Sequence, residues 1–231
     1  MPRMSRAENR AEQTRAILER ARAQLAEVGP AALSVRQIAR DVGLVSSAVY
    51  RYFPSRDELL TALIVESYDE LGDAVEQADA GVRRRSDLDK RFLAVCAAIR
   101  DWARANPHEY ALLYGSPVPG YVAPQTTTTS ASRITGAFLR LAQESETAGD
   151  VLGAPTGAVP PKGHQALGGV HLALETTVAD DRIVRWLMAW TTVFGHVSME
   201  LFGHMHRGIL DYDTHFQQVT GQLVADLGLT G

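Results

Sequence analysis

The sequence predicts an all-α protein in which a small N-terminal three-helix domain precedes a larger helical domain. Apolar residues recur at helical spacing in almost every periodic segment of the 231 residues, and no segment alternates like a β-strand. Charge divides the chain in the same way. Residues 1–56 carry ten arginines and five acidic residues, a net charge of +5, whereas the whole chain carries −4. A basic front module on an acidic body favours anion binding by the front.

Composition excludes several classes of protein. The single cysteine, Cys96, cannot form an intramolecular disulfide or a cysteine-based zinc site, and its apolar stripe favours a buried side chain over a redox sensor. The N-terminus lacks the apolar segment of a secretory signal, and no run of 18 apolar residues predicts a membrane span. We therefore expect a cytoplasmic protein.

The first helix is expected after a flexible basic leader, residues 1–9, which is either a frayed terminus or a minor-groove arm. One helical stripe follows and ends at Gly29-Pro30; it contains Ile17, Leu18, Ala21, Leu25 and Val28.

Two short helices follow. Ser34 and Gln37 have the spacing of a capping box, in which each side chain bonds a backbone N–H at the start of a helix. Gly43 ends that helix, and a third is expected over residues 46–52.

A second capping box, Ser55 and Glu58, opens a long fourth helix. Asp180 is the expected cap of the longest apolar helix, and residues 147–163, which have no period, predict a flexible loop. The remaining helices are expected over about 88–105, 108–114, 127–145, 164–174, 181–206 and 213–227.

Three helices within about 45 residues, two of them short and joined by a glycine turn, are typical of a helix-turn-helix unit. In its DNA-binding form the third helix enters the major groove with its N-terminal end first. The small residues Ser46, Ser47 and Ala48 lie at that end, where they allow close approach to base edges. Tyr50, Tyr52 and Arg56 follow, with groups suited to phosphate.

The front segment resembles the helix-turn-helix of the TetR family of bacterial transcription regulators over residues 10–65. The match is carried by the sequence SVRQIARDVGLVSSAVYRYFPSRDELLTAL, residues 34–63. The remaining residues resemble the helical bodies of that family, and TVFGHVSMELFGHMHRG is similar to a variant named for a Trp-His-Gly pattern. The resemblance implies a DNA-binding domain at 10–56, with the motif at about 34–53, and a ligand-binding and dimerisation domain at 57–231.

The resemblance also implies a function, a homodimeric repressor that binds a palindromic operator on double-stranded DNA and is released by a small molecule. We expect a mostly apolar effector, because large aromatic residues are frequent in the body. The family usually caps the third helix with Ser or Thr, whereas Val45 occupies that position here. The DNA-contacting positions implied by the match are Ser34, Arg36, Ser46, Ser47, Ala48, Tyr50, Tyr52 and Arg56.

The body supplies candidate residues for two further roles, although each can equally be ordinary core. The candidates for lining a ligand pocket are Trp102, Tyr110, Tyr114, Trp190, Phe194, His196 and Glu200. The candidates for a dimer interface along the last two helices are Leu187, Thr191, Ser198, Leu201 and Met205.

An alternative function is a metal-dependent enzyme that uses His196, Glu200 and His204, at i, i+4 and i+8 of one expected helix. Three ligands spread along about 12 Å of one helix cannot converge on one ion, so the regulator is favoured. The expected partner of a buried Glu200 is a flanking histidine. No phosphate-binding loop or catalytic motif indicates an enzyme or a cofactor.

Overall fold

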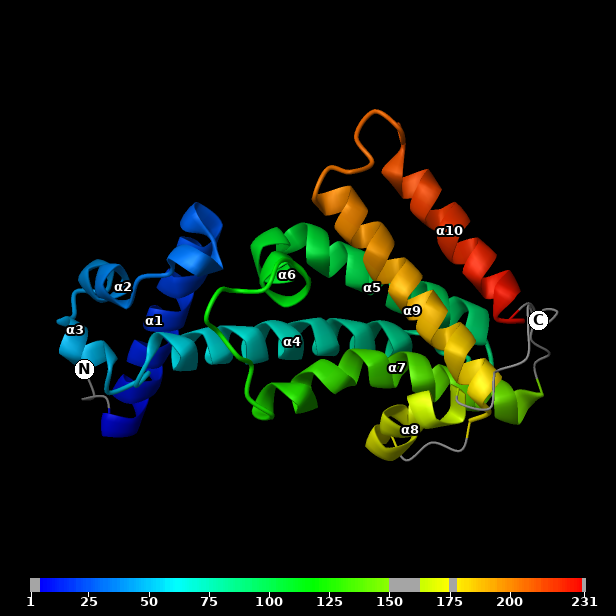
Figure 1. Ribbon diagram of the computed structural model, residues 1–231, viewed down its shortest axis with the longest axis horizontal. Helices are drawn as coiled ribbons and strands as arrows, with labels where there is room; N and C mark the ends of the chain where they lie inside the picture. Colours follow the sequence, from blue (N-terminus) through cyan, green and yellow to red (C-terminus); the bar gives the residue numbers. More distant parts are fainter. Residues whose placement is uncertain (1–4, 150–162, 175–177, 230–231) are drawn as a thin grey trace. The chain divides into compact units, whose positions relative to one another are not determined.

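The computed structural model describes residues 5–149, 163–174 and 178–229. Within these ranges the chain forms α-helices and one short 3-10 helix, with no strand, which confirms the predicted fold class (Figure 1). The chain divides into two compact units, one containing residues 1–70 and 106–130 and the other residues 71–105 and 131–231. None of the helices in the described ranges combines the length and apolar character needed to cross a membrane.

The first unit contains the N-terminal helices and a later segment of the chain. Its complete helices are α1 (Arg6–Val28), the 3-10 helix η1 (Pro30–Ala32), α2 (Val35–Asp41), α3 (Ser46–Val49) and α6 (Pro107–Tyr114). Two of the three boundaries between the units fall within α4 (Arg56–Gly81) and α7 (Thr126–Ala148), and the third falls directly before α6.

One apolar core holds the first unit together. Ile17, Ile38, Val49 and Leu63 are fully buried in it, one from each of the first four α-helices. Leu112 of α6 also belongs to this core. The structural unit is therefore not limited to the predicted residues 10–56, because the segment after position 105 buries its apolar side chains on the same core.

The N-terminal helix begins earlier than the sequence analysis predicted. Residues 6–9, assigned to a flexible leader, form the first turn of α1. A capping box explains this start: the Ser5 N–H donates to Glu8 Oε2 at 2.7 Å, and the Glu8 N–H donates to Ser5 Oγ at 3.2 Å. The prediction was wrong here because it did not use the Ser5 and Glu8 capping box as a start signal.

The capping box predicted at the start of α2 is confirmed only in part. Ser34 Oγ accepts from the Gln37 N–H at 3.4 Å, but the Gln37 amide donates to Asp41 instead of returning to Ser34. The Ser34 N–H donates to Oε1 of Gln24, a buried residue of α1, at 2.6 Å. A side chain distant in sequence thus completes the cap and joins α1 to α2.

The helices α3 and α4 begin differently. The N-cap of α3 is Val45, which makes no side-chain hydrogen bond, and α3 ends at Val49 rather than at residue 52. Valine has no acceptor for the first free N–H groups, so this helix lacks the usual cap. Ser55 does cap α4, because its Oγ accepts from the Glu58 N–H at 3.0 Å.

The second unit is built around α9 (Asp180–Leu201). Its other complete helices are α5 (Leu88–Ala105), α8 (Gly163–Leu174) and α10 (Tyr212–Asp226). Trp186 of α9 is fully buried. Its ring lies 5.7 Å from that of Phe92 in α5, and Phe92 lies 5.9 Å from Phe138 in α7, both edge to face. The aromatic stack therefore links α5, α7 and α9.

Buried charge also joins helices of this unit. The Arg91 guanidinium on α5 is almost fully buried; its Nε donates to Asp79 of α4 at 2.7 Å, and its Nη2 donates to Glu144 of α7 at 2.9 Å. The hydrogen bonds that Arg91 donates to Glu144 and Asp79 raise its pKa despite its burial. A buried charge is tolerated here because each carboxylate bonds it directly.

Two predictions about α9 need correction. Ala179, not Asp180, is the N-cap of α9, and the Asp180 carboxylate pairs with Nε2 of His171 at 2.8 Å. The helix ends at Leu201 instead of residue 206, followed by Gly203 in the left-handed region with φ of +78°. The loop predicted at 147–163 lies mostly outside the described residues.

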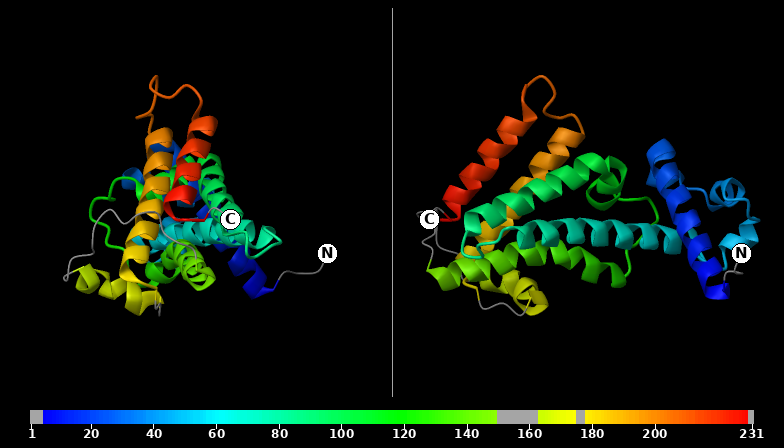
Figure 2. Two further views of the ribbon diagram at one scale, coloured as in Figure 1. Left: turned by 90° about the vertical axis from the view of Figure 1, so that its right-hand side faces the viewer. Right: turned by 180° about the vertical axis from the view of Figure 1, so that it is seen from behind.

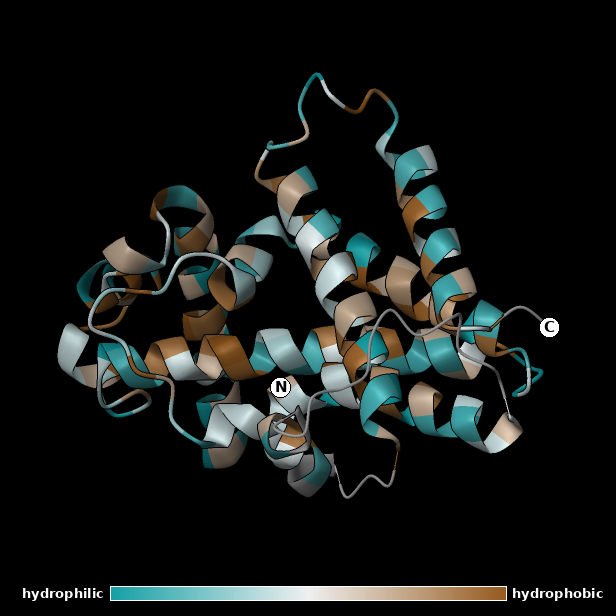
Figure 3. Cartoon of the chain, turned by 45° about the vertical axis from the view of Figure 1, so that its right-hand side comes forward, coloured by the Kyte–Doolittle hydropathy of each residue, from teal (hydrophilic) through white to brown (hydrophobic). Residues whose placement is uncertain are grey.

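The helices α9 and α10 lie side by side, joined by the turns that follow Leu201 (Figures 1 and 2). Asp211 caps α10, since its Oδ1 accepts from the Thr214 N–H at 3.0 Å. Hydrophobic and hydrophilic residues alternate along both helices (Figure 3). Both helices therefore carry apolar residues along their length, and in α9 some of these, such as Met188, stay exposed.

The turn between α2 and α3 generates a test of stability. Gly43 has a φ of +70°, and a Cβ placed on it would meet no atom within 4 Å. Gly43→Ala should therefore lower the free energy of unfolding by about 1–2 kcal/mol through backbone strain alone. Urea unfolding followed by circular dichroism measures this change.

Gly81→Ala is the matched control, because that position is also open but helical. It should leave stability unchanged or raise it by up to about 1 kcal/mol. An unchanged midpoint for Gly43→Ala would contradict the strain argument.

Candidate functional site

The turn between α2 and α3 presents one end of α3 to solvent. The Leu44 N–H donates to the Ala39 carbonyl at 2.8 Å, which ties the turn to α2. The N-cap residue Val45 is 69% exposed, Ser47 is exposed and Ser46 is half-buried. The side chains at this end of α3 are small and two of them are polar, so the helix can approach another surface closely.

The structure corrects one predicted base contact. Ala48 is only 5% exposed and faces the interior with Val49. A buried methyl group offers no surface to a base. Val45, which the sequence analysis places at the cap of the third helix, is exposed instead.

Four other predicted DNA contacts remain at or near this surface. Arg36 is exposed on α2, and Tyr50, which follows α3, is 44% exposed. Ser34 is half-buried at the start of α2. Tyr52 is also half-buried, with the Arg10 guanidinium 5.1 Å from its ring centre. Its ring packs within the unit, so only part of this side chain is available to a partner.

Arg56 makes bonds inside the protein that the sequence did not predict. Its Nη2 donates to the Pro30 carbonyl at 2.7 Å and to the Ala31 carbonyl at 3.1 Å, and its Nε donates to Leu33 at 3.3 Å. These hydrogen bonds thus join η1 and the residue after it to the start of α4. The prediction of a phosphate contact needs correction, because these N–H groups already have acceptors.

The distribution of charge around α2 and α3 favours an anionic partner. Arg36, Arg40 and Arg51 are exposed around α2 and α3. The acidic Asp41 is bound to Arg20 of α1 at 2.6 Å, and this bond holds the pKa of its carboxyl below the usual value. Its charge is therefore neutralised, and the exposed arginines dominate the local field.

Predicted ligand residues in the first unit form an aromatic cluster. Tyr110 is fully buried, its ring centre lies 5.1 Å from that of Tyr114, and Tyr114 lies 6.1 Å from Tyr68 of α4. Burial raises the pKa of Tyr114, so its phenol stays protonated. The cluster can pack against an apolar molecule, and it also serves as core.

The predicted ligand residues of the second unit include three large aromatic side chains, one on α5 and two on α9. Trp102 is buried on α5. Trp190 and Phe194 of α9 pack together with ring centres 5.3 Å apart. The buried Trp190 Nε1 has no hydrogen-bond partner among the described residues. A buried N–H of this kind can donate a hydrogen bond to an acceptor on a bound molecule.

The structure contradicts the expected partner of Glu200. Its carboxylate accepts from Arg100 of α5, with Nε to Oε2 at 2.7 Å and Nη2 to Oε1 at 2.8 Å. The Nδ1 atom of His196 is 3.9 Å from Oε2. His204 follows the end of α9, so the helical spacing of the three-ligand alternative is broken. The described residues contain no group of three side chains placed to hold a metal.

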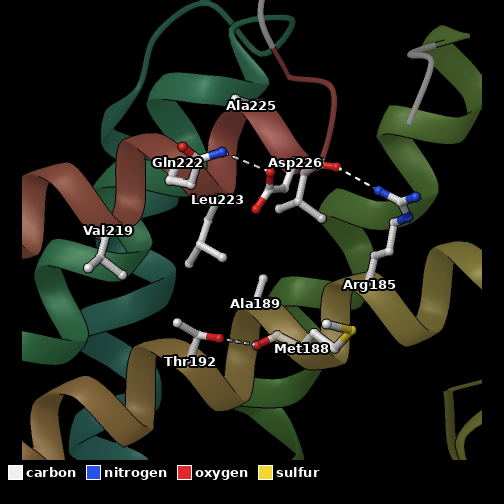
Figure 4. A pocket seen from close by; sticks show the side chains of 10 residues that line it. Arg185, Met188, Ala189, Thr192, Val219, Gln222, Leu223, Ala225 and Asp226 are labelled. Carbon is white, nitrogen blue, oxygen red and sulfur yellow. Dashed lines mark hydrogen bonds between the residues drawn. The ribbon is translucent and has the colours of Figure 1, made fainter. Parts of the chain in front are cut away.

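An open groove of about 550 Å³ runs between α9 and α10 (Figure 4). Its apolar lining includes Met188 and Ala189 of α9 and Val219 and Leu223 of α10. Arg185 closes one end, where its Nη1 donates to the Asp226 carbonyl at 3.1 Å.

One side of α9 beside this groove is exposed. We call it the α9 stripe: Met188, Thr191, Thr192, Gly195, Met199 and Phe202. Met188 is 60% exposed, unusual for so large an apolar side chain. Of the predicted dimer residues only Thr191 belongs to the stripe. Leu187, Ser198 and Leu201 are half-buried, and Met205 lies beyond the helix.

Cys96 is fully buried in α5, as expected. Burial raises the pKa of its thiol far above neutrality. The reactive thiolate is therefore not formed at physiological pH, which opposes a redox role.

Comparisons with known proteins agree with this geometry. Residues 17–63 match the family described as bacterial regulatory proteins, tetR family, and residues 92–223 match the tetracyclin repressor-like C-terminal domain. The chain is 41% identical over 220 residues to the HTH-type transcriptional regulator Rv1816 of Mycobacterium tuberculosis; the match covers 91% of this chain and 90% of the relative.

Two solved structures are also similar. The regulatory protein SCO4313 has a TM-score of 0.77 and 28% identity, covering 96% of this chain and 99% of that one. A protein from Rhodococcus sp. RHA1 has a TM-score of 0.71 and 24% identity over 93% of this chain and 95% of that one, a likeness of fold alone.

The hydrogen bonds of Arg56 predict that this residue stabilises the folded protein, which can be measured without DNA. Arg56→Ala should lower the free energy of unfolding by about 1–2 kcal/mol, because three charged hydrogen bonds from a partly exposed guanidinium are lost. Urea unfolding of the protein alone tests this. Arg51→Ala, on an exposed neighbour, should change little. Equal stabilities for the two variants would contradict the assigned role.

Proposed function

The chain belongs to the TetR family of bacterial transcription regulators, and from that premise we propose that it acts as a homodimeric repressor of a palindromic operator. The observation that carries the proposal is the exposed N-terminal end of α3, formed by Val45, Ser46 and Ser47 beside the exposed arginines of α2 and of the turn after α3. Family membership makes the chain a DNA-binding regulator and not an enzyme, so the metal-enzyme alternative is wrong.

We assign base contacts to the end of α3 and to Arg36. Ser46 and Ser47 offer hydroxyl groups to base edges, and the exposed Val45 offers an apolar contact suited to the methyl of thymine. Arg36 supplies a guanidinium from the adjacent α2. Ser34, Tyr50 and Tyr52 are assigned to phosphate, because their hydroxyl groups lie at or near the same exposed surface.

We assign the dimer interface to the α9 stripe and the neighbouring groove. An isologous dimer requires one self-complementary surface on each copy. Exposed methionines supply the apolar area, and Gly195 in the middle allows two helices to approach closely. This assignment replaces Leu187, Ser198, Leu201 and Met205 as the centre of the interface and keeps Thr191.

We propose that a small, mostly apolar effector binds in the body and lowers DNA affinity. The supporting observations are the Tyr110 and Tyr114 pair in one unit and the Trp190 and Phe194 pair in the other. A tenfold loss of affinity requires an effector to favour the non-binding state by about 1.4 kcal/mol. Such a regulator works where bacterial DNA lies, in the cytoplasm.

Selection of duplex sites from a random pool by the purified protein is the first test. We expect one inverted repeat with half-sites about 34–36 Å apart, or a multiple of that distance. Recovery of an asymmetric site, or of none with the protein stable and folded, would contradict the dimeric repressor.

The arginine on α2 generates a second test. Arg36→Ala should weaken binding to the selected site by roughly 5- to 150-fold and relax its preference at one base, as expected for the loss of a base-reading guanidinium. Fluorescence anisotropy at fixed salt measures both effects. Arg140→Ala, which removes an exposed charge in the second unit, should bind like the parent protein. If both variants bind alike, Arg36 is not a reading residue.

The α9 stripe generates a third test. Gly195→Trp should raise the dissociation constant of the dimer at least tenfold, because the added ring holds two helices apart. A Cβ at Gly195 meets no atom within 4 Å, so the single chain tolerates the change. Analytical ultracentrifugation measures the shift. Gly169→Trp, at an equally open position of α8, is the control and should leave the dimer intact.

A further inference from the structure

A pocket of about 290 Å³ lies between α5 and α10 of the second unit, away from the α9 stripe. Four of its lining residues come from α5, namely Ala97, Arg100, Asp101 and Arg104, and three from α10, namely Asp213, Phe216 and Gln217. The pocket combines two guanidinium groups and two carboxylates with one aromatic face. None of these residues was predicted to bind a ligand.

A single carboxylate bridges the two arginines. Oδ1 of Asp213 lies 2.7 Å from Arg100 Nη2 and 3.1 Å from Arg104 Nη1. The Asp213 side chain is 68% exposed and belongs to the first turn of α10. An exposed carboxylate forms only a weak ion pair, since water competes for both groups. The bond to Asp213 can therefore be exchanged for a bond to another carboxylate.

Arg100 is held in a fixed orientation beneath this carboxylate. Its side chain is 7% exposed, Glu200 binds it through two hydrogen bonds, and its guanidinium carbon lies 5.0 Å from the centre of the Phe216 ring. A guanidinium fixed before binding loses little freedom when a second anion arrives. Phe216 presents an apolar face beside it.

A second observation comes from behind Phe216. His196 is 6% exposed, and neither ring nitrogen has a hydrogen-bond partner among the described residues. Its ring centre lies 5.2 Å from that of Phe216 and 5.1 Å from that of His215. Buried nitrogens without partners are uncommon in a region that serves stability alone. A buried imidazole with unsatisfied nitrogens therefore packs against the same Phe216 ring that lines the pocket.

We propose that the α5–α10 pocket binds a small organic carboxylate, whose carboxyl group replaces Asp213 between Arg100 and Arg104 and whose apolar part lies against Phe216. Asp213 is then a built-in competitor that occupies the pocket when no ligand is present. The ligand's negative charge also lies at the N-terminus of α10, where the helix dipole favours an anion. This site does not depend on the proposed operator or effector.

Isothermal titration of the full chain with benzoate at pH 7.5 tests the proposal. We expect saturable binding to the parent protein, at least tenfold tighter binding to Asp213→Asn, and at least tenfold weaker binding to Arg104→Gln. Arg83→Gln, an exposed charge before α5, is the matched control and should bind like the parent. Circular dichroism of each variant establishes that it is folded.

Three results would overturn the proposal. No saturable binding to either the parent or Asp213→Asn would show that the pocket has no carboxylate site. Equal affinities for the parent, Arg104→Gln and Asp213→Asn would place the benzoate elsewhere. Equal binding of neutral benzamide would show that the charge is not recognised. Operator binding, measured separately, fails or succeeds independently of all three.

Discussion

The packing of α9 is the constraint on which the second unit depends, because this one helix has three different surfaces to satisfy. Trp186 occupies the core between α5 and α7 through edge-to-face contacts with Phe92. Glu200 pairs with the buried Arg100. The α9 stripe stays exposed. A rotation of the helix about its axis would expose the indole and separate the ion pair, so the core and the charges together fix which residues reach the surface.

The helices themselves were largely predictable from the sequence. Apolar spacing located the α-helices of the described residues, and Ser34 and Ser55 marked the starts of α2 and α4, because capping is a local interaction between neighbouring residues. Errors arose at two ends where a local signal was overlooked. Ser5 extended α1 into the supposed leader, and Gly203 ended α9 before its apolar pattern did.

The site was predictable only where it follows from local structure. The turn at Gly43 and the polar start of α3 are encoded by adjacent residues. The partners of Arg56 and Arg100 are not, because their acceptors lie 23 or more residues away in the sequence. The exposed side of α9 was not predicted for another reason. An apolar helix with several apolar faces does not reveal which of them its own chain covers.

The burial of Cys96 has a practical consequence for studying this protein. The chain contains one cysteine, and its thiol is fully enclosed and kept protonated. A thiol-reactive dye therefore has no native target in the folded protein. A cysteine introduced at an exposed position such as Ser47 would take up the label alone, so distances between two copies can be followed by energy transfer without first removing a natural residue.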